Sequence, residues 1–235
     1  MEEKKIKALF FDTGPIITLV MSRLIWILPL LKNKFGGKFY ITPAVKQELI
    51  TRPLEIKRFE FEALQTLKLI KDGTLELYNN VPQKKVAELI DLANSSFKIN
   101  NKNLEIIQEG EVESVACALD IGADAVVMDE RTLRLFIENN RDMKRLLEKR
   151  FQKQVMVDIA KMDQFSAQLN KIKIIRSTEL VGLAYKMGIL DDYVPELKKG
   201  DEILVDSILW TVKYNGAAIS EREINEIKDY LLKNQ

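Results

Sequence analysis

The chain has 235 residues, of which 46% are hydrophobic and 30% are charged, a composition typical of a globular protein with one main domain. It contains no histidine, which excludes Ser-His-Asp and Cys-His catalysis, histidine general bases and Cys/His zinc sites. The net charge of +1 excludes no class of partner, because local patches of charge decide binding.

Three features predict a cytoplasmic protein without a membrane partner. Cys117 is the only cysteine, so no internal disulfide can form, which fits a reducing compartment. The first five residues mix acidic and basic side chains with no apolar stretch behind them, so we expect no signal peptide. The most apolar segment, residues 16–31, is too short to span a bilayer. We predict that this segment is one helix, buried or pairing two copies of the chain as a homodimer.

A buried strand is expected near the start of the chain. Residues 8–11 are four consecutive apolar residues that run into Asp12, and the Thr13-Gly14-Pro15 group then breaks the strand. Such a continuous apolar run suits a strand that is buried on both faces of a parallel sheet. Asp12 then stands at the carboxyl end of that strand, the edge where open α/β sheets place their functional sites.

Strands and helices are expected to alternate along the rest of the chain, which predicts an α/β fold with a mostly parallel, helix-covered sheet. The other expected strands are 38–41, 75–78, 123–129 and either 155–157 or 172–175, of which we favour the second. The expected helices are 43–51, 53–72, 82–93, 110–122, 130–150 with a break near 139, 177–188, 196–214 with a break near Gly200, and 221–233. The asparagine-rich segment 94–103 is expected to be a loop.

Four acidic residues from separate segments are expected to meet at one edge of this sheet. Between Glu111 and Asp129, a helix descends roughly 16 Å and a strand climbs back roughly 16 Å, so the two carboxylates should end close together. Asp12 ends the first strand at the same edge, and Glu48 lies in the first turns of the helix that leaves the second strand. Clustered carboxylates repel one another and resist ionisation unless cations neutralise them. All-oxygen ligation indicates Mg²⁺ or Mn²⁺, a site that suits phosphodiester hydrolysis.

The same stretches resemble the PIN domain, a family similar to 5′ nucleases in fold. The resemblance covers roughly residues 6–188 and rests on Phe11-Asp12-Thr13-Gly14, Thr42-Pro43 with Glu48, Gly110-Glu111 with its alanine-rich helix, and Met128-Asp129-Glu130. It implies a three-layer fold with a central parallel sheet of about five strands over residues 1–188. The helices expected over 189–235 lie outside the part that resembles the family, and we expect them to form an extension packed on it. The resemblance also implies a ribonuclease that depends on Mg²⁺ or Mn²⁺.

Residue by residue, Asp12, Glu48, Glu111 and Asp129 match the first to fourth acids of the family. Thr13 resembles the hydroxyl residue that helps to hold the first acid or the water. Glu113 is a rival for the third acid, but it lies deeper in its helix and points about 200° away from Glu111, so we rank it lower. The simpler alternatives are that these residues cap helices or lie exposed on them.

The leading functional hypothesis is a metal-dependent endoribonuclease that acts on single-stranded or structured RNA through the four carboxylates. Alternatives are a catalytically silent module that binds RNA or protein, and the toxin component of a toxin-antitoxin pair with an antitoxin protein as partner. Arg176 closes a strand at the expected active edge and is a candidate phosphate contact, and Lys46 is a second, weaker one. The basic run from Arg141 to Lys153 is read as a solvated helix face.

Overall fold

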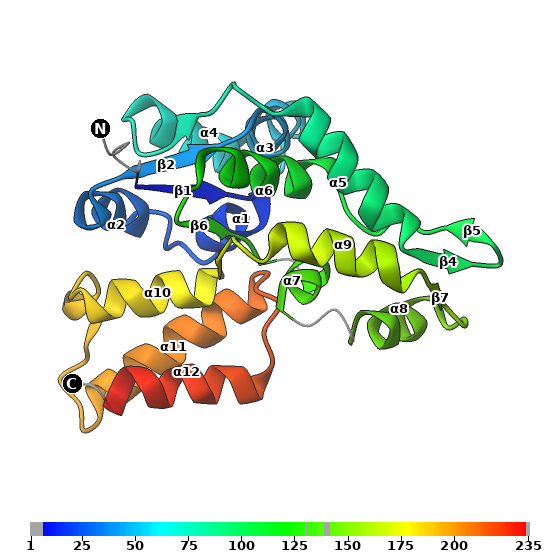
Figure 1. Cartoon of the computed structure of the whole chain (residues 1–235). Helices are drawn as coiled ribbons and strands as arrows, with labels where there is room; N and C mark the ends of the chain where they lie inside the picture. The colour runs from blue at the N-terminus through cyan, green and yellow to red at the C-terminus, as the bar shows by residue number, and fades with distance from the viewer. Residues whose placement is uncertain (1–6, 130, 139–141, 234–235) are drawn as a thin grey trace, which may run out of the picture.

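A computed structural model describes residues 7–129, 131–138 and 142–233; Glu130 and Arg141, which belong to patterns noted above, lie outside these residues. Its main sheet has five strands, all parallel, in the order β3-β2-β1-β6-β8. The strands are β1 (Ala8–Phe11), β2 (Lys38–Ile41), β3 (Glu76–Leu77), β6 (Ala125–Val127) and β8 (Ile174–Ile175). Helices cover both faces of the sheet, which confirms the predicted three-layer α/β class (Figure 1).

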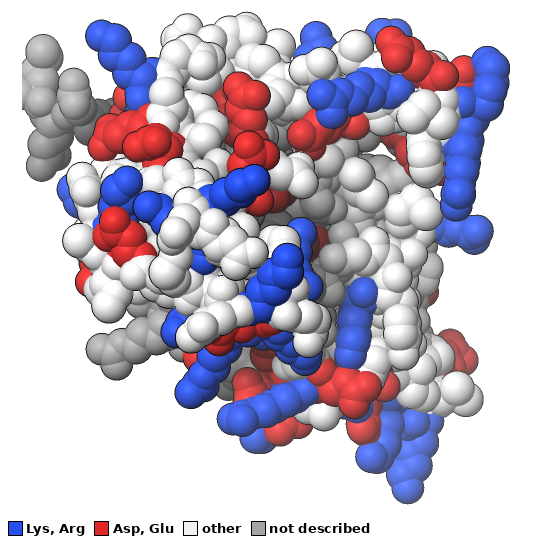
Figure 2. Space-filling view, turned by 90° about the vertical axis from the view of Figure 1, so that its right-hand side faces the viewer, with Lys and Arg blue, Asp and Glu red and all other residues white. Residues whose placement is uncertain are grey.

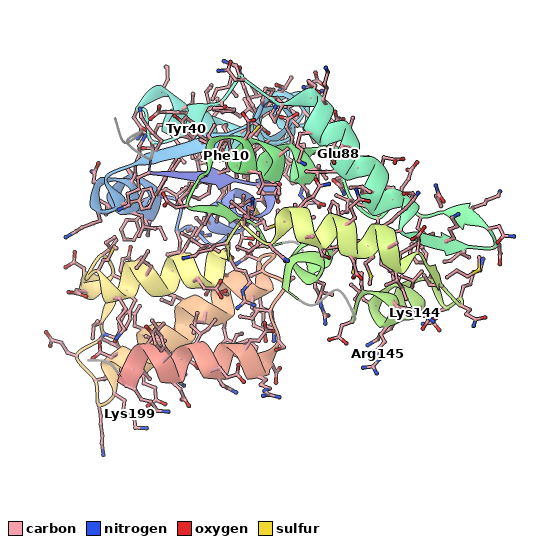
Figure 3. The ribbon with its side chains drawn as sticks, in the orientation of Figure 1. Phe10, Tyr40, Glu88, Lys144, Arg145 and Lys199 are labelled. Carbon is pink, nitrogen blue, oxygen red and sulfur yellow. The ribbon has the colours of Figure 1, made fainter. Side chains whose placement is uncertain are left out.

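Alternate residues of β1 point into two separate hydrophobic cores, because successive side chains of a strand face opposite sides. Leu9 and Phe11 join the core of one face, whereas Ala8 and Phe10 join the core of the other. Phe10 pairs in register with Tyr40 of β2, and their rings lie 5.3 Å apart (Figure 3). All four β1 residues are buried, which explains the continuous apolar run in the sequence.

The two faces carry different sets of helices. The face of Leu9 and Phe11 is covered mainly by α1 (Thr13–Met21), α2 (Ile27–Phe35), α4 (Glu60–Lys71), α10 (Ser177–Lys186), α11 (Gly200–Tyr214) and α12 (Glu221–Lys233). The opposite face is covered by α5 (Gln83–Ser95), α6 (Glu109–Ile121), α7 (Arg131–Glu138), α8 (Met143–Phe151) and α9 (Ile159–Leu169). In the described part of the chain, no helix has the length and apolar character needed to cross a membrane.

The prediction of one continuous helix over residues 16–31 is wrong. Helix α1 ends in a Schellman motif, in which Arg23 adopts a left-handed conformation (φ 58°). The N–H groups of Arg23 and Leu24 donate to the carbonyls of Val20 and Leu19, and a second helix, α2, begins at Ile27. This position is usually glycine, so an arginine there gave no signal in the sequence. Homodimer formation through this region stays a prediction.

Two more expectations change. Residues Pro53–Glu55 form only a short 3₁₀ turn, and α4 begins at Glu60. The expected loop 94–103 contains a hairpin of β4 (Phe97–Ile99) and β5 (Lys102–Asn103), which projects from the body of the molecule (Figure 1). Asn100 and Asn101 both have positive φ, as a two-residue hairpin turn requires, and asparagine tolerates this conformation.

Of the two segments considered for the last strand of the main sheet, the favoured one, within residues 172–175, forms it. Ile174–Ile175 pairs with β6 in the main sheet, whereas β7 (Met156–Val157) pairs antiparallel with β4 in a small second sheet. The C-terminal helices α11 and α12 share a hydrophobic core with β1: Val205, Leu209 and Ile224 belong to the same cluster as Phe11. The division of the chain at residue 188 stays a prediction, and the residues on either side of it bury one common core.

Candidate functional site

The candidate site lies where the direction of chain progression across the sheet reverses. From the central strand β1, the chain passes first to β2 on one side and later to β6 on the other. The carboxyl ends of two such strands form a crevice, the usual ligand site of open α/β sheets. Asp12 follows β1 directly and its backbone N–H donates to Val127 O at 2.9 Å, which ties it to the end of β6. Asp129 comes two residues after β6.

Asp12 has two structural roles at once. It is the N-cap of α1, where its side chain accepts a hydrogen bond of 3.4 Å from the N–H of Gly14. Its side chain is also buried, and this burial, together with the charges of Glu48 and Asp129, raises the pKa of Asp12 to about 6 despite the N–H donors of Thr13 and Gly14. A capping aspartate with a raised pKa carries negative charge that its surroundings do not fully compensate.

Glu48 reaches the site from an unusual helical turn. Helix α3 (Pro43–Lys46) starts at the N-cap Thr42, as predicted, and continues as a π-helical turn over Gln47–Thr51. In this turn the N–H of Arg52 donates to Gln47 O, five residues back. Such turns are often found at functional sites. The carboxylate of Glu48 accepts a 2.7 Å hydrogen bond from Thr13 Oγ1.

Glycine at position 110 allows Glu48 to approach the start of α6. A Cβ atom on Gly110 would lie 3.2 Å from Glu48 Oε1, which is closer than ordinary van der Waals contact. The next residue, Glu111, lies in the first turn of α6, and its carboxylate accepts a hydrogen bond of 3.3 Å from the N–H of Gln108. The predicted Gly110-Glu111 pair therefore places one acid on the helix terminus and makes room for another.

The structure separates Glu111 from its rival Glu113. Glu113 is buried, and its Oε1 accepts a 3.0 Å hydrogen bond from the N–H of Ala44 at the start of α3. It therefore joins α6 to α3, and it does not line the pocket that contains Glu111. These positions agree with the ranking of Glu111 above Glu113.

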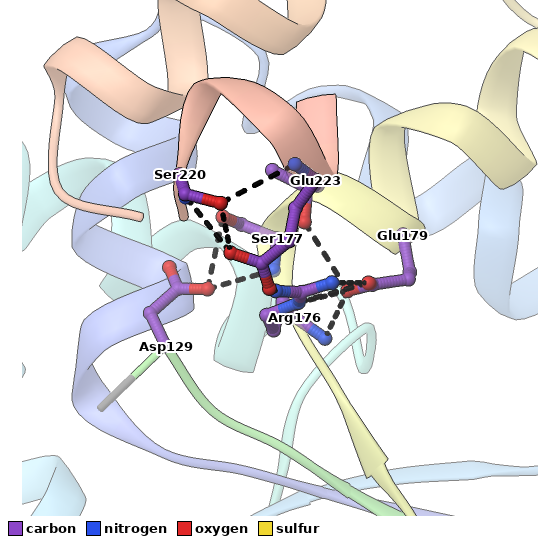
Figure 4. Close-up of polar contacts among 7 residues, drawn as sticks. Asp129, Arg176, Ser177, Glu179, Ser220 and Glu223 are labelled. Atoms are coloured by element: carbon purple, nitrogen blue, oxygen red, sulfur yellow. Dashed lines mark hydrogen bonds and ion pairs between the residues drawn. The ribbon is translucent and has the colours of Figure 1, made fainter. Parts of the chain in front are cut away.

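Both carboxylate oxygens of Asp129 are held by hydrogen bonds from other elements. Oδ1 accepts from the N–H and the hydroxyl of Ser177, at 2.8 and 3.0 Å, and Oδ2 accepts from Thr18 Oγ1 at 3.0 Å. Figure 4 shows the Ser177 side of this arrangement at the start of α10. Burial raises the pKa of Asp129, although the donors from Ser177 and Thr18 oppose the increase.

The four predicted acids line one open pocket of about 410 Å³, called here the acidic pocket. The residues around it are Asp12, Thr13, Gly14, Glu48, Gln108, Glu111, Asp129, Arg131, Gly216 and Ala218. Gly14 lies between two of the acids, since a Cβ atom on it would be 3.6 Å from both Asp12 Oδ2 and Asp129 Cβ. Thr13 borders the same pocket, but its hydroxyl holds the second acid, Glu48, rather than the first.

The acidic pocket fits a divalent cation by the chemistry of its donors. It offers carboxylate oxygens from four segments; burial chiefly, and to a lesser extent the charges of Glu48 and Asp129, raise the pKa of Asp12, and a bound cation would offset both effects. Across residues 7–129, 131–138 and 142–233, no three acidic, histidine or cysteine side chains are already arranged to hold a metal ion. Binding of a cation would therefore draw the carboxylates closer together.

Two predicted phosphate contacts have different positions. The guanidinium of Arg176 is 13% exposed and is held between two carboxylates: it pairs with Glu179, and its NH1 donates to Glu223 Oε1 at 2.6 Å (Figure 4). These contacts favour a structural role for Arg176 over the predicted phosphate contact. Lys46 ends α3, two residues before Glu48, and does not line the acidic pocket.

Several residues of the site were missed in the sequence. Thr18 and Ser177 hold Asp129, and Gly216 and Ala218 bring the C-terminal helices to the edge of the pocket. Ser177 had a usable signal, because it opens a helix directly after a strand at the active edge. Thr18 and Gly216 had no such signal in the sequence. Thr18 contacts Asp129, which is 111 residues away in the chain. Gly216 reaches the pocket only because the C-terminal helices dock there.

A second hollow of about 490 Å³ borders the acidic pocket and shares Glu48 and Glu111 with it. We call it the side groove; its basic residues are Arg52, next to the π-helical turn, and Arg150 of α8. Positive and negative side chains are interspersed on the face shown in Figure 2, without one large basic surface. Arg145 of α8 is largely exposed (Figure 3), and Lys144 of the same helix borders a separate hollow beside β7 and α9.

A scan against protein-family models, a search of curated proteins and a search of solved structures each found no match for this chain.

Proposed function

We propose that this protein is a Mg²⁺- or Mn²⁺-dependent nuclease that hydrolyses RNA phosphodiester bonds in the acidic pocket. The observation that carries the proposal is the convergence of Asp12, Glu48, Glu111 and Asp129 from four segments on one pocket at the sheet's reversal point. A cluster of carboxylates with a raised pKa in a cleft indicates a functional site more often than a structural one.

The four acids and the hydroxyl groups that hold them have distinct tasks in this proposal. The four carboxylates would hold the cation, with Asp12 and Asp129 after the ends of adjacent strands and Glu48 and Glu111 on two helices. When bound, the cation offsets the charge of the scissile phosphate and lowers the pKa of a water molecule. Thr13 fixes the carboxylate of Glu48, and Ser177 and Thr18 fix that of Asp129. In the hydrolysis, the oxygen of a water molecule would form the new bond to phosphorus while the bond to the ribose oxygen breaks, and the departing ribose oxygen would take up the proton that the water loses.

The side groove is the proposed path of the substrate backbone. It opens on the acidic pocket through the shared residues Glu48 and Glu111, and it presents the guanidinium groups of Arg52 and Arg150. Arginine binds phosphate oxygens through two donors at once, which positions a strand without reading its sequence. Acidic residues, including Glu105 and Glu109, also line this groove, so we expect few phosphate contacts and modest affinity.

The test is cleavage of a mixed single-stranded RNA in EDTA, Mg²⁺ or Mn²⁺. We expect products only with metal, and none with Asp12→Asn. The matched control is Asp91→Asn, which changes an exposed aspartate of α5 away from the pocket and should leave cleavage intact. A folded wild-type protein that cuts neither single-stranded nor structured RNA in Mn²⁺ would contradict the proposal.

The alternative is a catalytically silent protein that binds RNA or a partner. Isothermal titration calorimetry with Mn²⁺ distinguishes the nuclease from the silent protein. The nuclease should bind Mn²⁺ in a manner that Asp12→Asn abolishes, whereas a silent protein should bind it weakly and equally in both variants.

A further inference from the structure

The two residues that hold Asp129 lie on different helices, and each is linked to the C-terminal helices: Thr18 directly through Gly216, and Ser177 through its neighbour Arg176. Ser177 opens α10 and binds one carboxylate oxygen, while Thr18 lies in α1 and binds the other. Both donors are buried. The orientation of the Asp129 carboxylate therefore depends on how α1 and α10 are placed relative to each other.

The first contact with the C-terminal part runs through Arg176, the residue before Ser177. The guanidinium of Arg176 pairs with Glu179 in the same helix and donates from NH1 to Glu223 Oε1 of α12 at 2.6 Å. Glu223 in turn accepts from the N–H and hydroxyl of Ser220, at 2.9 and 2.7 Å, and so caps α12. Figure 4 shows this series of contacts from the start of α12 to the start of α10 and on to Asp129.

The second contact runs through Gly216, in the connection between α11 and α12. This residue has φ 140°, and a Cβ atom on it would lie 2.8 Å from Thr18 Oγ1, the atom that donates to Asp129. Only a residue without a side chain can bring the backbone this close to the hydroxyl of Thr18. Gly216 also borders the acidic pocket, so its contact with Thr18 lies at the site itself.

We propose that the segment from Gly216 to Glu223 is a positioning element for the fourth carboxylate. It supports Ser177 through the Glu223–Arg176 ion pair and supports Thr18 by direct packing, and so fixes Asp129 from both sides. The consequence for metal binding rests on the nuclease proposal above, whereas the positioning itself does not. Residues that orient a metal ligand in this way typically change metal affinity by about 10–100-fold when they are altered.

The first test removes the ion pair and keeps the helix cap. In Glu223→Gln, the glutamine can still accept from Ser220, but it loses the charge that pairs with Arg176. The matched control is Glu226→Gln, which changes an exposed glutamate of the same helix that pairs with Arg222 one turn away. Two readouts are measured: the amide ¹H shift of Ser177 in the metal-free protein, and the dissociation constant for Mn²⁺.

We expect Glu223→Gln to shift the Ser177 amide resonance and to weaken Mn²⁺ binding about tenfold, with Glu226→Gln changing neither. In a cleavage assay, kcat should fall while the KM for RNA stays the same, because the change acts on the acid and not on strand binding. A shifted Ser177 amide in a protein that never binds Mn²⁺ would support the positioning and overturn the nuclease proposal.

The second test is a double-mutant cycle on Gly216 and Thr18. Gly216→Ala places a Cβ against Thr18 Oγ1, whereas in the background of Thr18→Ala that oxygen is absent and the added methyl group meets no hydroxyl. Gly73→Ala is the control, since Gly73 also has positive φ but a Cβ there would touch nothing within 4 Å. Backbone strain at position 216 lowers stability in either background and cancels in the cycle.

The proposal predicts that Gly216→Ala weakens Mn²⁺ binding in the wild-type background and has little further effect beside Thr18→Ala. Equal effects in both backgrounds would overturn the contact through Thr18. If Glu223→Gln and Gly216→Ala lower the melting temperature without changing the Ser177 amide or Mn²⁺ affinity, the segment is structural only and the inference is wrong.

Discussion

The hydroxyl of Thr13 donates a 2.7 Å hydrogen bond to Glu48 Oε2, joining residues that are 35 positions apart in the chain. Thr13 follows β1 and Glu48 lies in the π-helical turn after α3, so the bond fixes one acid relative to the strand that carries another. The resemblance to PIN domains assigned this hydroxyl to the first acid or to the water, whereas in the structure it orients the second acid.

Replacing this hydroxyl should weaken the site without unfolding the protein. Thr13→Val keeps the shape of the side chain and removes the donor, and a hydrogen bond to a charged group is worth about 1.5–3 kcal/mol. We expect Mn²⁺ binding and cleavage to fall roughly 10–100-fold, and Thr13→Ser to restore most of both. Calorimetry with Mn²⁺ measures the first effect. Full Mn²⁺ affinity in the valine variant together with a loss in the serine variant would show that shape, not the hydroxyl, matters.

Asp12→Asn should stabilise the metal-free protein in a pH-dependent way. The folded pKa of Asp12, about 6, lies above the unfolded value of 3.8, so the wild-type carboxyl favours the fold below pH 4 and this contribution is lost as pH rises through 6. The difference corresponds to about 3 kcal/mol at pH 8. Asparagine avoids this loss and still caps α1.

Thermal unfolding in EDTA at pH 4.5 and pH 8 measures this effect. The melting temperature of Asp12→Asn should exceed that of the wild type by several degrees at pH 8 and by much less at pH 4.5. Asp91→Asn serves as the exposed control. A difference that is the same at both pH values would mean that the burial of the Asp12 charge is not its cause.

Gly110→Ala should weaken Mn²⁺ binding without lowering the stability of the fold. Alanine is favoured over glycine inside a helix by about 0.5–1 kcal/mol, but here its Cβ would lie 3.2 Å from Glu48 Oε1. We expect a melting temperature that is unchanged or higher, together with weaker Mn²⁺ binding because Glu48 is displaced. Asp120→Ala, at an exposed position near the other end of α6 and outside both hollows, is the control. Full Mn²⁺ affinity in Gly110→Ala would show that Glu48 can move aside without leaving the site.

The two arginines of the side groove should contribute to RNA affinity through phosphate contacts. Arg52→Ala and Arg150→Ala should each weaken binding and reduce the slope of log K against log salt concentration by about 0.7. Arg145→Ala is the control, because this residue lies on the same helix as Arg150 but outside the groove. Fluorescence anisotropy at several salt concentrations gives the slopes. An equal reduction for Arg145 would indicate a diffuse electrostatic effect and not a defined path.

The sequence by itself predicted a mostly parallel, helix-covered sheet and the edge at which the acids meet, but not the order of the strands. The signals for these features are local: a continuous apolar run for β1, the Thr42-Pro43 start of α3 and the left-handed Gly122 that ends α6. Strand and helix lengths then bring Asp12, Glu48, Glu111 and Asp129 to one pocket, because parallel strands connected by helices all end at the same edge.

Only the tertiary structure decided which side chains hold those acids and which part of the C-terminal segment borders the pocket. Thr13 binds Glu48, Arg176 pairs with Glu223 and Gly216 packs on Thr18, and each of these contacts joins residues that no local pattern relates. Arg23, Asn100 and Asn101 likewise adopt positive φ, although glycine is the residue that usually indicates this conformation in a sequence. The physical reason is that periodicity and capping are fixed by neighbours along the chain, whereas the partners of a side chain depend on how distant segments pack.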